Sequence, residues 1–243
     1  MAQPVHFKAV VDRVEQHDAD VASFRLISEK RLPRFTPGQF IHLTLDEYDP
    51  SGYWPESRVF SVANAVADRR TLELTISRQG RYTRRILGEV RVGRSVWGKG
   101  PYGEFSIEGR NGCERAVLIA GGTGITPFCA FMDDALHVRA LPLKQVTLYY
   151  GARTPGLLIY QALARRCASE LPGFRTELWA EHGAFGDLRG GRLSVDQIVR
   201  ETGGTDGTVY YLSGPMAMIR SFQRTLIDQL GAETAQVVID AWE

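Results

Sequence analysis

The chain has 243 residues, a formal net charge of +1, 44% hydrophobic residues and 23% charged residues. This composition is typical of a globular protein with one large domain or two ordinary ones. Near neutrality gives no general electrostatic attraction to nucleic acid or to an anionic membrane, and no apolar run approaches the roughly 20 residues that span a bilayer. We therefore expect neither partner.

Cysteine and histidine usage narrows the class further. Cys113, Cys129 and Cys167 lie far apart with no CxxC pair, which excludes an iron–sulfur cluster held by four cysteines of this chain. The five histidines have no metal-ligand spacing, so we expect no metal site. The first ten residues lack the apolar core of a signal peptide. We expect a cytoplasmic protein with reduced thiols.

The first half of the chain consists of short β-rich runs separated by turn signals such as Thr36-Pro37-Gly38 and Gly100-Pro101. Six such runs within about a hundred residues predict a six-stranded antiparallel β-barrel. One helix is expected at 82–87. The predicted strands are 7–14, 21–27, 39–45, 58–63, 71–77 and 94–97.

Two segments of this barrel carry more chemistry than a barrel requires. Arg58-Val59-Phe60-Ser61 combines a guanidinium, an aromatic ring and a hydroxyl, which suit a phosphate, a planar ring and a ring heteroatom; the alternative is an edge strand with an exposed arginine. Gly80 and Thr83 stand at a predicted helix start, where an anion can bind. Six arginines lie around them, and Glu89 is the only acidic residue among these arginines. They form either a local positive patch or an ordinary solvated basic face: Arg78, Arg81, Arg84, Arg85, Arg91 and Arg94.

The second half changes to alternating strands and helices, which predicts a five-stranded parallel sheet with helices on both faces. The predicted strands are 116–120, 145–151, 174–180, 208–213 and 236–240, and the predicted helices are 127–138, 157–169, 195–201 and 216–230. Ligands of such sheets bind beyond the carboxyl ends of the strands.

A glycine turn follows the first of these strands. Gly121, Gly122 and Gly124 precede Thr126, the expected N-cap, and Pro127, the expected first helical residue. A strand, a glycine turn and a helix start together favour a nucleotide diphosphate, although a tight connection remains the alternative. No lysine follows the glycines, and Pro127 stands where the dinucleotide fingerprint has its third glycine, so neither common phosphate motif fits.

Together these segments resemble the ferredoxin–NADP reductase family, in a form without an iron–sulfur domain. The resemblance covers nearly the whole chain and implies a flavin-binding barrel at 1–108 followed by a nicotinamide-nucleotide domain at 109–243. Five motifs carry it in order: Pro37-Gly38-Gln39-Phe40 with Arg58-Val59-Phe60-Ser61, then Gly80-Arg81-Tyr82-Thr83, Gly100-Pro101-Tyr102-Gly103-Glu104-Phe105, and Gly121-Gly122-Thr123-Gly124-Ile125-Thr126-Pro127.

The resemblance implies residue roles. Arg58 would contact the flavin phosphate, Phe60 would pack on the flavin ring, and Ser61 would approach its N5. The implied FAD-binding residues are Arg58, Val59, Phe60, Ser61, Gly80, Arg81, Tyr82, Thr83 and Trp242. The implied nicotinamide-nucleotide residues are Gly121, Gly122, Thr123, Gly124, Ile125, Arg153, Ser213, Gly214, Pro215 and Met216, and the implied catalytic residues are Ser61, Thr123, Ser213, Asp240 and Trp242.

Two departures from the family pattern concern these residues. Ser213 in Ser213-Gly214-Pro215 stands where the family usually has cysteine. The chain ends Asp240-Ala241-Trp242-Glu243 where many relatives end in Glu-x-Tyr/Phe, so Trp242 would cover the flavin and Asp240 would be the carboxylate. The alternative is a C-terminal strand with a frayed aromatic residue.

The resemblance implies an FAD-containing reductase that passes hydride from NADPH or NADH to flavin and then single electrons to a separate ferredoxin, flavodoxin or oxygenase component. Arg153 stands where NAD binders often have an acidic residue, which slightly favours NADPH over NADH. The nucleotide preference stays open. An acidic partner would dock at Arg81, Arg84 and Arg85. The alternatives are a free-flavin reductase and a subunit of a larger complex for electron transfer or nucleotide sensing.

Overall fold

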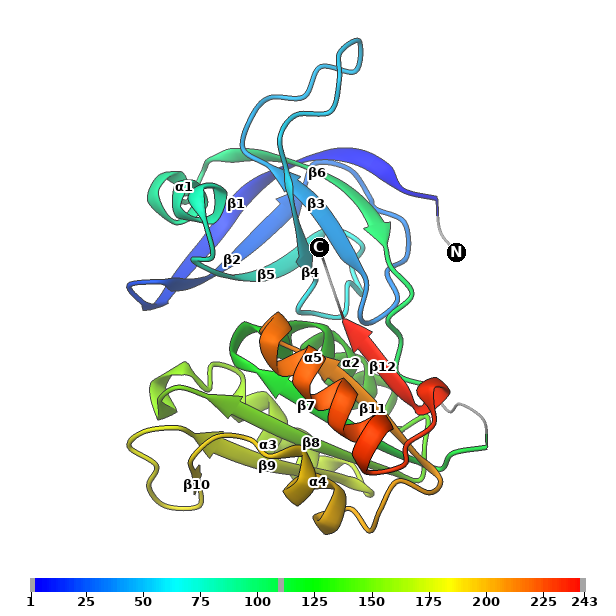
Figure 1. Cartoon of the computed structure of the whole chain (residues 1–243). Helices are drawn as coiled ribbons and strands as arrows, with labels where there is room; N and C mark the ends of the chain where they lie inside the picture. The colour runs from blue at the N-terminus through cyan, green and yellow to red at the C-terminus, as the bar shows by residue number, and fades with distance from the viewer. Residues whose placement is uncertain (1–2, 109–111, 241–243) are drawn as a thin grey trace. The chain divides into compact units, whose positions relative to one another are not determined.

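The computed structural model describes residues 3–108 and 112–240. The chain divides into two compact units, Met1–Ser106 and Ile107–Glu243 (Figure 1). In the residues described, no helix is both long and apolar enough to cross a lipid bilayer.

The first unit is a six-stranded antiparallel sheet in the order β4-β3-β6-β1-β2-β5, which confirms the predicted barrel. Ala63 N–H donates to the Glu73 carbonyl at 2.8 Å, and Asn64 Nδ2 donates to the Thr71 carbonyl at 3.0 Å. These bonds join the end of β4 to β5, so the two edges of the sheet nearly close. The strands are β1 Val5–Asp18, β2 Val21–Ser28, β3 Phe40–Thr44, β4 Arg58–Ser61, β5 Thr71–Ser77 and β6 Ser95–Tyr102.

Strand β6 runs five residues beyond its predicted end, through the Gly100-Pro101 pair that we expected to form a turn. The glycines serve packing instead. Gly98 lies opposite Phe7 on β1, and a Cβ atom at Gly98 would stand 2.2 Å from the Phe7 ring. The strand therefore continues because its glycines make room for side chains of neighbouring strands.

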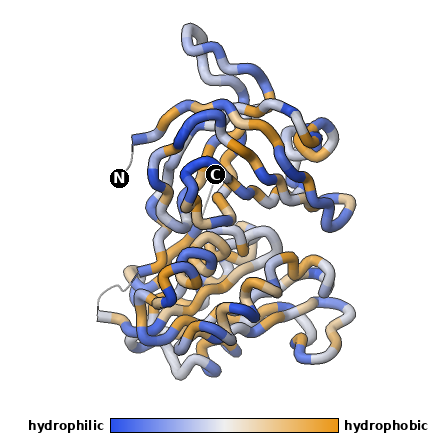
Figure 2. Tube along the Cα trace, turned by 180° about the vertical axis from the view of Figure 1, so that it is seen from behind, coloured by the Kyte–Doolittle hydropathy of each residue, from blue (hydrophilic) through white to orange (hydrophobic). Residues whose placement is uncertain are grey.

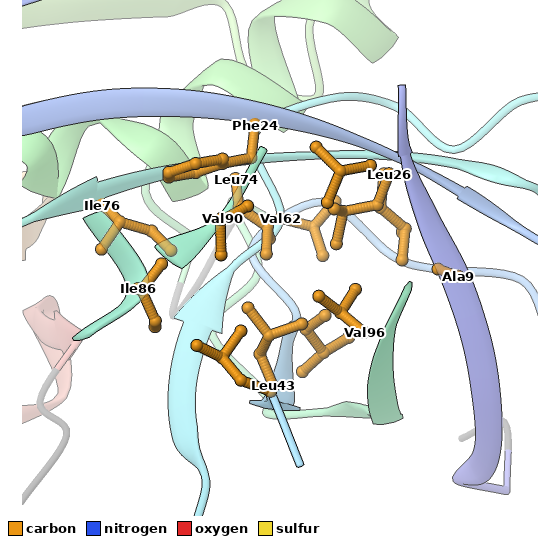
Figure 3. Packing of buried hydrophobic residues seen from close by; sticks show 14 of the residues in the cluster. Ala9, Phe24, Leu26, Leu43, Val62, Leu74, Ile76, Ile86, Val90 and Val96 are labelled. Carbon is orange, nitrogen blue, oxygen red and sulfur yellow. The ribbon is translucent and has the colours of Figure 1, made fainter. Parts of the chain in front are cut away.

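The interior of the barrel is filled by alternate residues of its strands and by α1 (Arg81–Glu89) (Figure 3). Helix α1, predicted at 82–87, turns Tyr82, Thr83 and Ile86 inward and leaves Arg81 and Arg84 exposed. Along the trace, the barrel strands alternate between hydrophilic and hydrophobic residues, whereas central strands of the second unit are mostly hydrophobic (Figure 2). This is the contrast expected between a sheet with one buried face and a sheet buried on both faces.

The second unit is a parallel sheet in the order β10-β9-β8-β7-β11-β12. The five predicted strands are present as β7 Arg115–Gly121, β8 Gln145–Ala152, β9 Phe174–Ala180, β11 Thr208–Ser213 and β12 Val237–Asp240. A sixth strand, β10, was not predicted. It has only two residues, Arg189–Gly190, which is too short to show an apolar period.

Helices cover both faces of this sheet, as predicted. Helices α2 (Thr126–Val138) and α3 (Gln161–Glu170) lie on one face, and α4 (Val195–Glu201) and α5 (Met216–Arg224) lie on the other (Figure 1). Ile198 of α4 and Ile219 of α5 pack in one cluster with Val117 and Tyr210 of the sheet. The expected helix at 157–169 begins only at Gln161, after a 3-10 turn at Pro155–Leu157.

We predict that Leu118→Ala destabilises the second unit by about 2–5 kcal/mol, because Leu118 is fully buried on the central strand β7 and its truncation leaves a cavity. Hydrogen exchange resolved by peptide should accelerate in β8 and β11. Val138→Ala, at an exposed position of α2, should change exchange little. Equal effects of the two substitutions would contradict the assignment of β7 to the centre of the core.

Candidate cofactor-binding sites

The first predicted site lies at the start of α1. Thr83 Oγ1 accepts hydrogen bonds from the backbone N–H groups of Gln79 (2.8 Å) and Gly80 (3.1 Å). The N-cap, Gly80, has no side chain to bond the N–H groups of the first turn, and that turn has no acidic residue. The first turn of α1 therefore offers N–H groups and positive helix-dipole potential to an anion.

Gly80 indicates that this helix start is open to a ligand. Its φ of −171° is extended backbone that any residue adopts, and an added Cβ atom would meet nothing within 4 Å. The fold itself thus does not require glycine at this position. A phosphate group brought close to the backbone would require it, so the surroundings of Gly80 fit the pyrophosphate of FAD.

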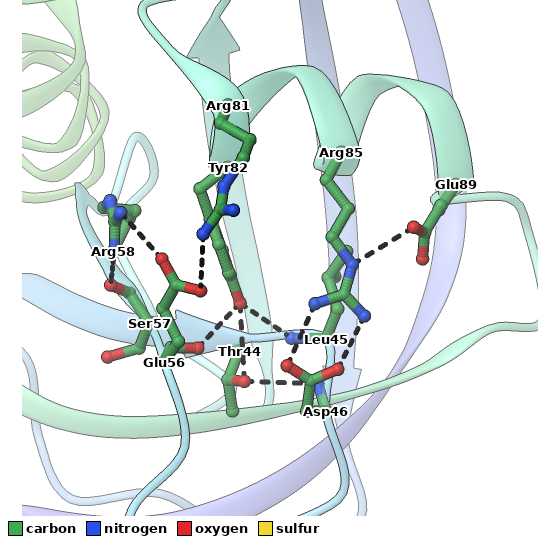
Figure 4. Close-up of polar contacts among 10 residues, drawn as sticks. All are labelled: Thr44, Leu45, Asp46, Glu56, Ser57, Arg58, Arg81, Tyr82, Arg85 and Glu89. Atoms are coloured by element: carbon green, nitrogen blue, oxygen red, sulfur yellow. Dashed lines mark hydrogen bonds and ion pairs between the residues drawn. The ribbon is translucent and has the colours of Figure 1, made fainter.

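Arg58 and Tyr82 are brought together across the barrel surface. The Arg58 guanidinium lies over the Tyr82 ring, with its Cζ 4.9 Å from the ring centroid. Tyr82 is buried, and its hydroxyl accepts from Leu45 N–H (3.2 Å) and donates to the Glu56 carbonyl (2.9 Å) (Figure 4). Tyr82 therefore contributes to the predicted site by supporting Arg58, while its hydroxyl is used inside the fold.

The other barrel residues of the predicted site lie on β4. Phe60 is half-buried and packs against the barrel core, so part of its ring stays accessible. Ser61 is buried at 9% exposure, and Val59 is half-buried opposite His42. Arg58, Phe60 and Ser61 thus stand in a row along one short strand beside the start of α1.

The arginine patch is less free than the sequence suggested, and the expectation that only Glu89 opposes it is wrong. Arg78 pairs with Asp20 at 2.8 Å, and Arg85 pairs with Asp46 at 2.6 Å as well as with Glu89 at 3.1 Å. These hydrogen bonds lower the pKa of Asp46 and raise that of Arg85. Asp20 and Asp46 are distant in sequence from the helix, so residue order could not reveal them.

The second predicted site lies at the carboxyl end of the parallel sheet. Strand β7 ends at Gly121 and leads through a 3-10 helix (η1, Gly122–Ile125) directly into α2. The prediction of Thr126 as the N-cap is therefore wrong. Thr126 is already helical, and its hydroxyl donates back to the Thr123 carbonyl at 3.1 Å because η1 supplies the preceding turn.

The glycines of this turn are required first by contact with a second turn. A Cβ atom at Gly124 would stand 2.4 Å from both N and Cα of Gly214, and one at Gly214 would stand 3.0 Å from the Gly121 backbone. Gly214 also has a φ of +148°, which side-chain-bearing residues rarely adopt. The predicted segments 121–125 and 213–216 thus form one joined edge in which backbone lies against backbone.

Ser213 and Asp240 meet at the same edge. They are register partners at the ends of β11 and β12, and Ser213 Oγ donates to Asp240 Oδ2 at 2.9 Å. Both side chains are buried, at 2% and 7% exposure, so water has little access to this pair. Trp242, the predicted flavin cover, lies outside the described residues.

The remaining predicted residues take different positions around the edge. Thr123 is half-buried in η1, and Met216 is half-buried at the start of α5. Arg153 is exposed just beyond β8, and its carbonyl accepts from His182 N–H at 3.0 Å. Ile125 is fully buried, so its side chain serves the core and only its backbone is left to face a ligand.

A cleft of about 520 Å³ at the opposite end of the sheet was not predicted from the sequence. Three of its charged side chains bind one another: Arg189 pairs with Glu201 at 2.6 Å and with Glu177 at 3.3 Å. The hydrogen bonds from Arg189 are the main reason that the pKa of Glu201 falls to about 2. We interpret these groups as structural because their charges are satisfied within the chain.

Comparisons with known proteins match both units of the chain to cofactor-binding domains. Residues 7–107 match the profile of the oxidoreductase FAD-binding domain, and residues 118–224 match that of the oxidoreductase NAD-binding domain. The chain belongs to the ferredoxin–NADP reductase family. As a member of this family it carries FAD and a nicotinamide nucleotide as cofactors. The FAD match contains Arg58 and Gly80, and the NAD match contains the joined turns at Gly124 and Gly214.

Three known proteins illustrate the similarity. The reductase component of propane 2-monooxygenase from Mycolicibacterium smegmatis is 27% identical over 218 residues, which are 86% of this chain and 60% of that protein. A probable electron transfer subunit of dihydroorotate dehydrogenase B from Methanopyrus kandleri is 32% identical over 138 residues, 56% of this chain and 46% of that protein. The chain therefore spans less than two thirds of either relative.

Among solved structures, a cytochrome P450 reductase from Amycolatopsis superposes with a TM-score of 0.81 at 26% identity, covering 98% of this chain and 69% of that one. The present chain thus shares the order of its two domains with that longer reductase.

We predict that Gly124→Ala weakens binding of NADP⁺ and NAD⁺ by at least about tenfold, because the new methyl group forces the two turns apart. Isothermal titration of the purified variant measures this effect. Gly156→Ala, beyond the end of β8, is the control, since a Cβ atom there meets nothing within 4 Å. Unchanged nucleotide affinity in Gly124→Ala would show that the joined turns do not form the nucleotide site.

Proposed function

We propose that this protein is an NAD(P)H-dependent flavoprotein reductase that delivers electrons to a separate redox protein. The observation that carries the proposal is that one chain matches an FAD-binding and an NAD-binding domain, the first with an open helix start and the second with a joined pair of glycine turns. When both cofactors are bound, they supply hydride transfer from nicotinamide to flavin and the release of single electrons. We assign 1–108 to flavin and 109–243 to the nicotinamide nucleotide.

On the barrel, the proposed tasks are binding and orientation. Arg58 and Arg81 provide guanidinium groups for the FAD phosphates, and the first turn of α1 adds backbone N–H donors. The accessible part of Phe60 and the hydroxyl of Ser61 lie farther along β4, where the flavin ring is expected. A bulky extended cofactor is therefore held at its charged part by cations and at its planar part by packing.

On the sheet, the proposed tasks are positioning and exclusion of water. The joined turns give a nicotinamide nucleotide a rigid backbone surface, and Thr123 presents its side chain from the same edge. Because Ser213 uses its hydroxyl proton on Asp240, it offers a nicotinamide only acceptor lone pairs. We propose that Ser213, in the position where the family usually has cysteine, lines the nicotinamide pocket through this oriented oxygen.

The proposed acceptor is an acidic ferredoxin, flavodoxin or oxygenase component. The relative from Mycolicibacterium smegmatis is named as the reductase component of a monooxygenase, which supports an acceptor in a separate component. Arg81, with 90% of its side chain exposed, and Arg84 are the cations of the predicted dock that face solvent, whereas Arg85 is held in ion pairs. The proposed location is the cytoplasm.

A second candidate function is that of an electron-transfer subunit that works only within a larger complex. The similarity to the Methanopyrus kandleri electron transfer subunit supports it. Turnover of NADH or NADPH with an artificial acceptor by the isolated chain would count against this candidate.

The visible spectrum of freshly purified protein tests the main proposal. We expect flavin bands that persist through gel filtration and bleach on anaerobic addition of NADH or NADPH. Bands lost on gel filtration would instead favour a free-flavin reductase. Protein that takes up no added FAD would contradict the proposal.

We predict that Arg84→Glu slows reduction of an acidic ferredoxin by roughly threefold to tenfold at low ionic strength, and that the difference disappears at high salt. Stopped-flow measurement of the second-order rate constant tests this. Arg81 is left intact because it belongs to the proposed FAD site. Arg200→Glu, on the exposed face of α4, is the charge-matched control. Equal rate constants for Arg84→Glu and Arg200→Glu would contradict docking at α1.

A further inference from the structure

Glu56 occupies the space between the two arginines of the proposed FAD site. It lies two residues before β4, in the loop that joins β3 to β4. Its Oε1 lies 2.9 Å from Arg58 Nη2, and its Oε2 lies 3.8 Å from Arg81 Nη2 (Figure 4). One carboxylate of the chain thus contacts both of the cations that would receive the pyrophosphate.

The backbone of Glu56 is held in place from the barrel side. The buried Tyr82 hydroxyl donates to the Glu56 carbonyl at 2.9 Å, and the same tyrosine ring lies beneath the Arg58 guanidinium. The next residue, Ser57, accepts from Trp54 Nε1 through its hydroxyl (3.0 Å) and from Arg58 Nη1 through its carbonyl (2.7 Å). The backbone of Glu56 is therefore held beside the two arginines by the fold.

The carboxylate itself remains able to leave. The side chain of Glu56 is 45% exposed, and its described polar contacts are the two arginines. Moving an exposed carboxylate into water costs little free energy, because ion pairs at this exposure contribute only about 0.2–1 kcal/mol each. The anchored backbone and the exposed carboxylate together make a group that can rotate away without disturbing the barrel.

We propose that Glu56 is an internal anion that competes with the FAD pyrophosphate for Arg58 and Arg81. A carboxylate and a phosphate cannot both use the same guanidinium N–H groups, and their negative charges repel each other at contact distance. FAD binding then requires Glu56 to swing into solvent, so this residue sets how tightly the flavin is retained. The inference rests on the assignment of FAD to the barrel.

The test is the affinity of the flavin-free protein for FAD, measured by quenching of flavin fluorescence. Glu56→Gln keeps the size of the side chain and removes its charge, and we expect it to lower the Kd for FAD by about threefold to tenfold and to slow FAD release. Glu56→Ala should act in the same direction. Glu89→Gln is the matched control, because Glu89 pairs with Arg85 and Arg94, farther along α1.

The outcomes separate this inference from the assignment on which it rests. Tighter FAD binding in both Glu56 variants and not in Glu89→Gln supports the competition. FAD binding that is unchanged or weaker in the Glu56 variants overturns the competition. Weaker binding would show that the carboxylate holds the arginines in place for FAD, because its removal would then lower the affinity. If the unaltered protein binds no FAD, the flavin assignment fails and the inference fails with it.

Discussion

The proposed nicotinamide edge, residues 121–125 and 213–216, depends on one constraint, the close backbone contact between Gly124 and Gly214. Because Gly214 follows Ser213 on β11, this contact fixes where that strand ends relative to the turn after β7. Asp240 then follows from sheet register, since it pairs with Ser213 on the neighbouring strand. Turn, serine and carboxylate are therefore placed by backbone geometry. A side chain at either glycine would disturb all three at once.

The proposed flavin edge is held together differently, by ion pairs and by one buried aromatic residue. Tyr82 joins the start of α1 to the loop before β4, and it places the Arg58 guanidinium and the Glu56 backbone around the same ring. Backbone contacts hold the proposed nicotinamide edge, whereas exposed ion pairs and one cation–ring contact form the proposed flavin edge. The groups of the two proposed edges are therefore fixed to different degrees, by backbone packing in one and by exposed side-chain contacts in the other.

Sequence patterns predicted the secondary structure well, because strands and helices depend mainly on residues that are close in sequence. Strands Phe174–Ala180 and Thr208–Ser213 and helix Val195–Glu201 have their predicted bounds. Several errors concern residues whose role depends on a distant partner: Gly98 makes room for Phe7, Gly124 for Gly214, and Asp46 neutralises Arg85. The motifs predict where the sites lie, but Glu56 belongs to none of them. It is found only when loop and helix are seen together.

The central claim is that each edge binds its own cofactor, and hydrogen exchange of the purified protein with each cofactor added alone tests it most directly. The account predicts that FAD slows exchange at residues 79–83 and 58–62 and leaves the sheet edge unchanged. NADP⁺ or NAD⁺ should slow exchange at 121–127 and 213–216. Protection of the Gly124 turn by FAD, or of the first turn of α1 by the nicotinamide nucleotide, would contradict the account.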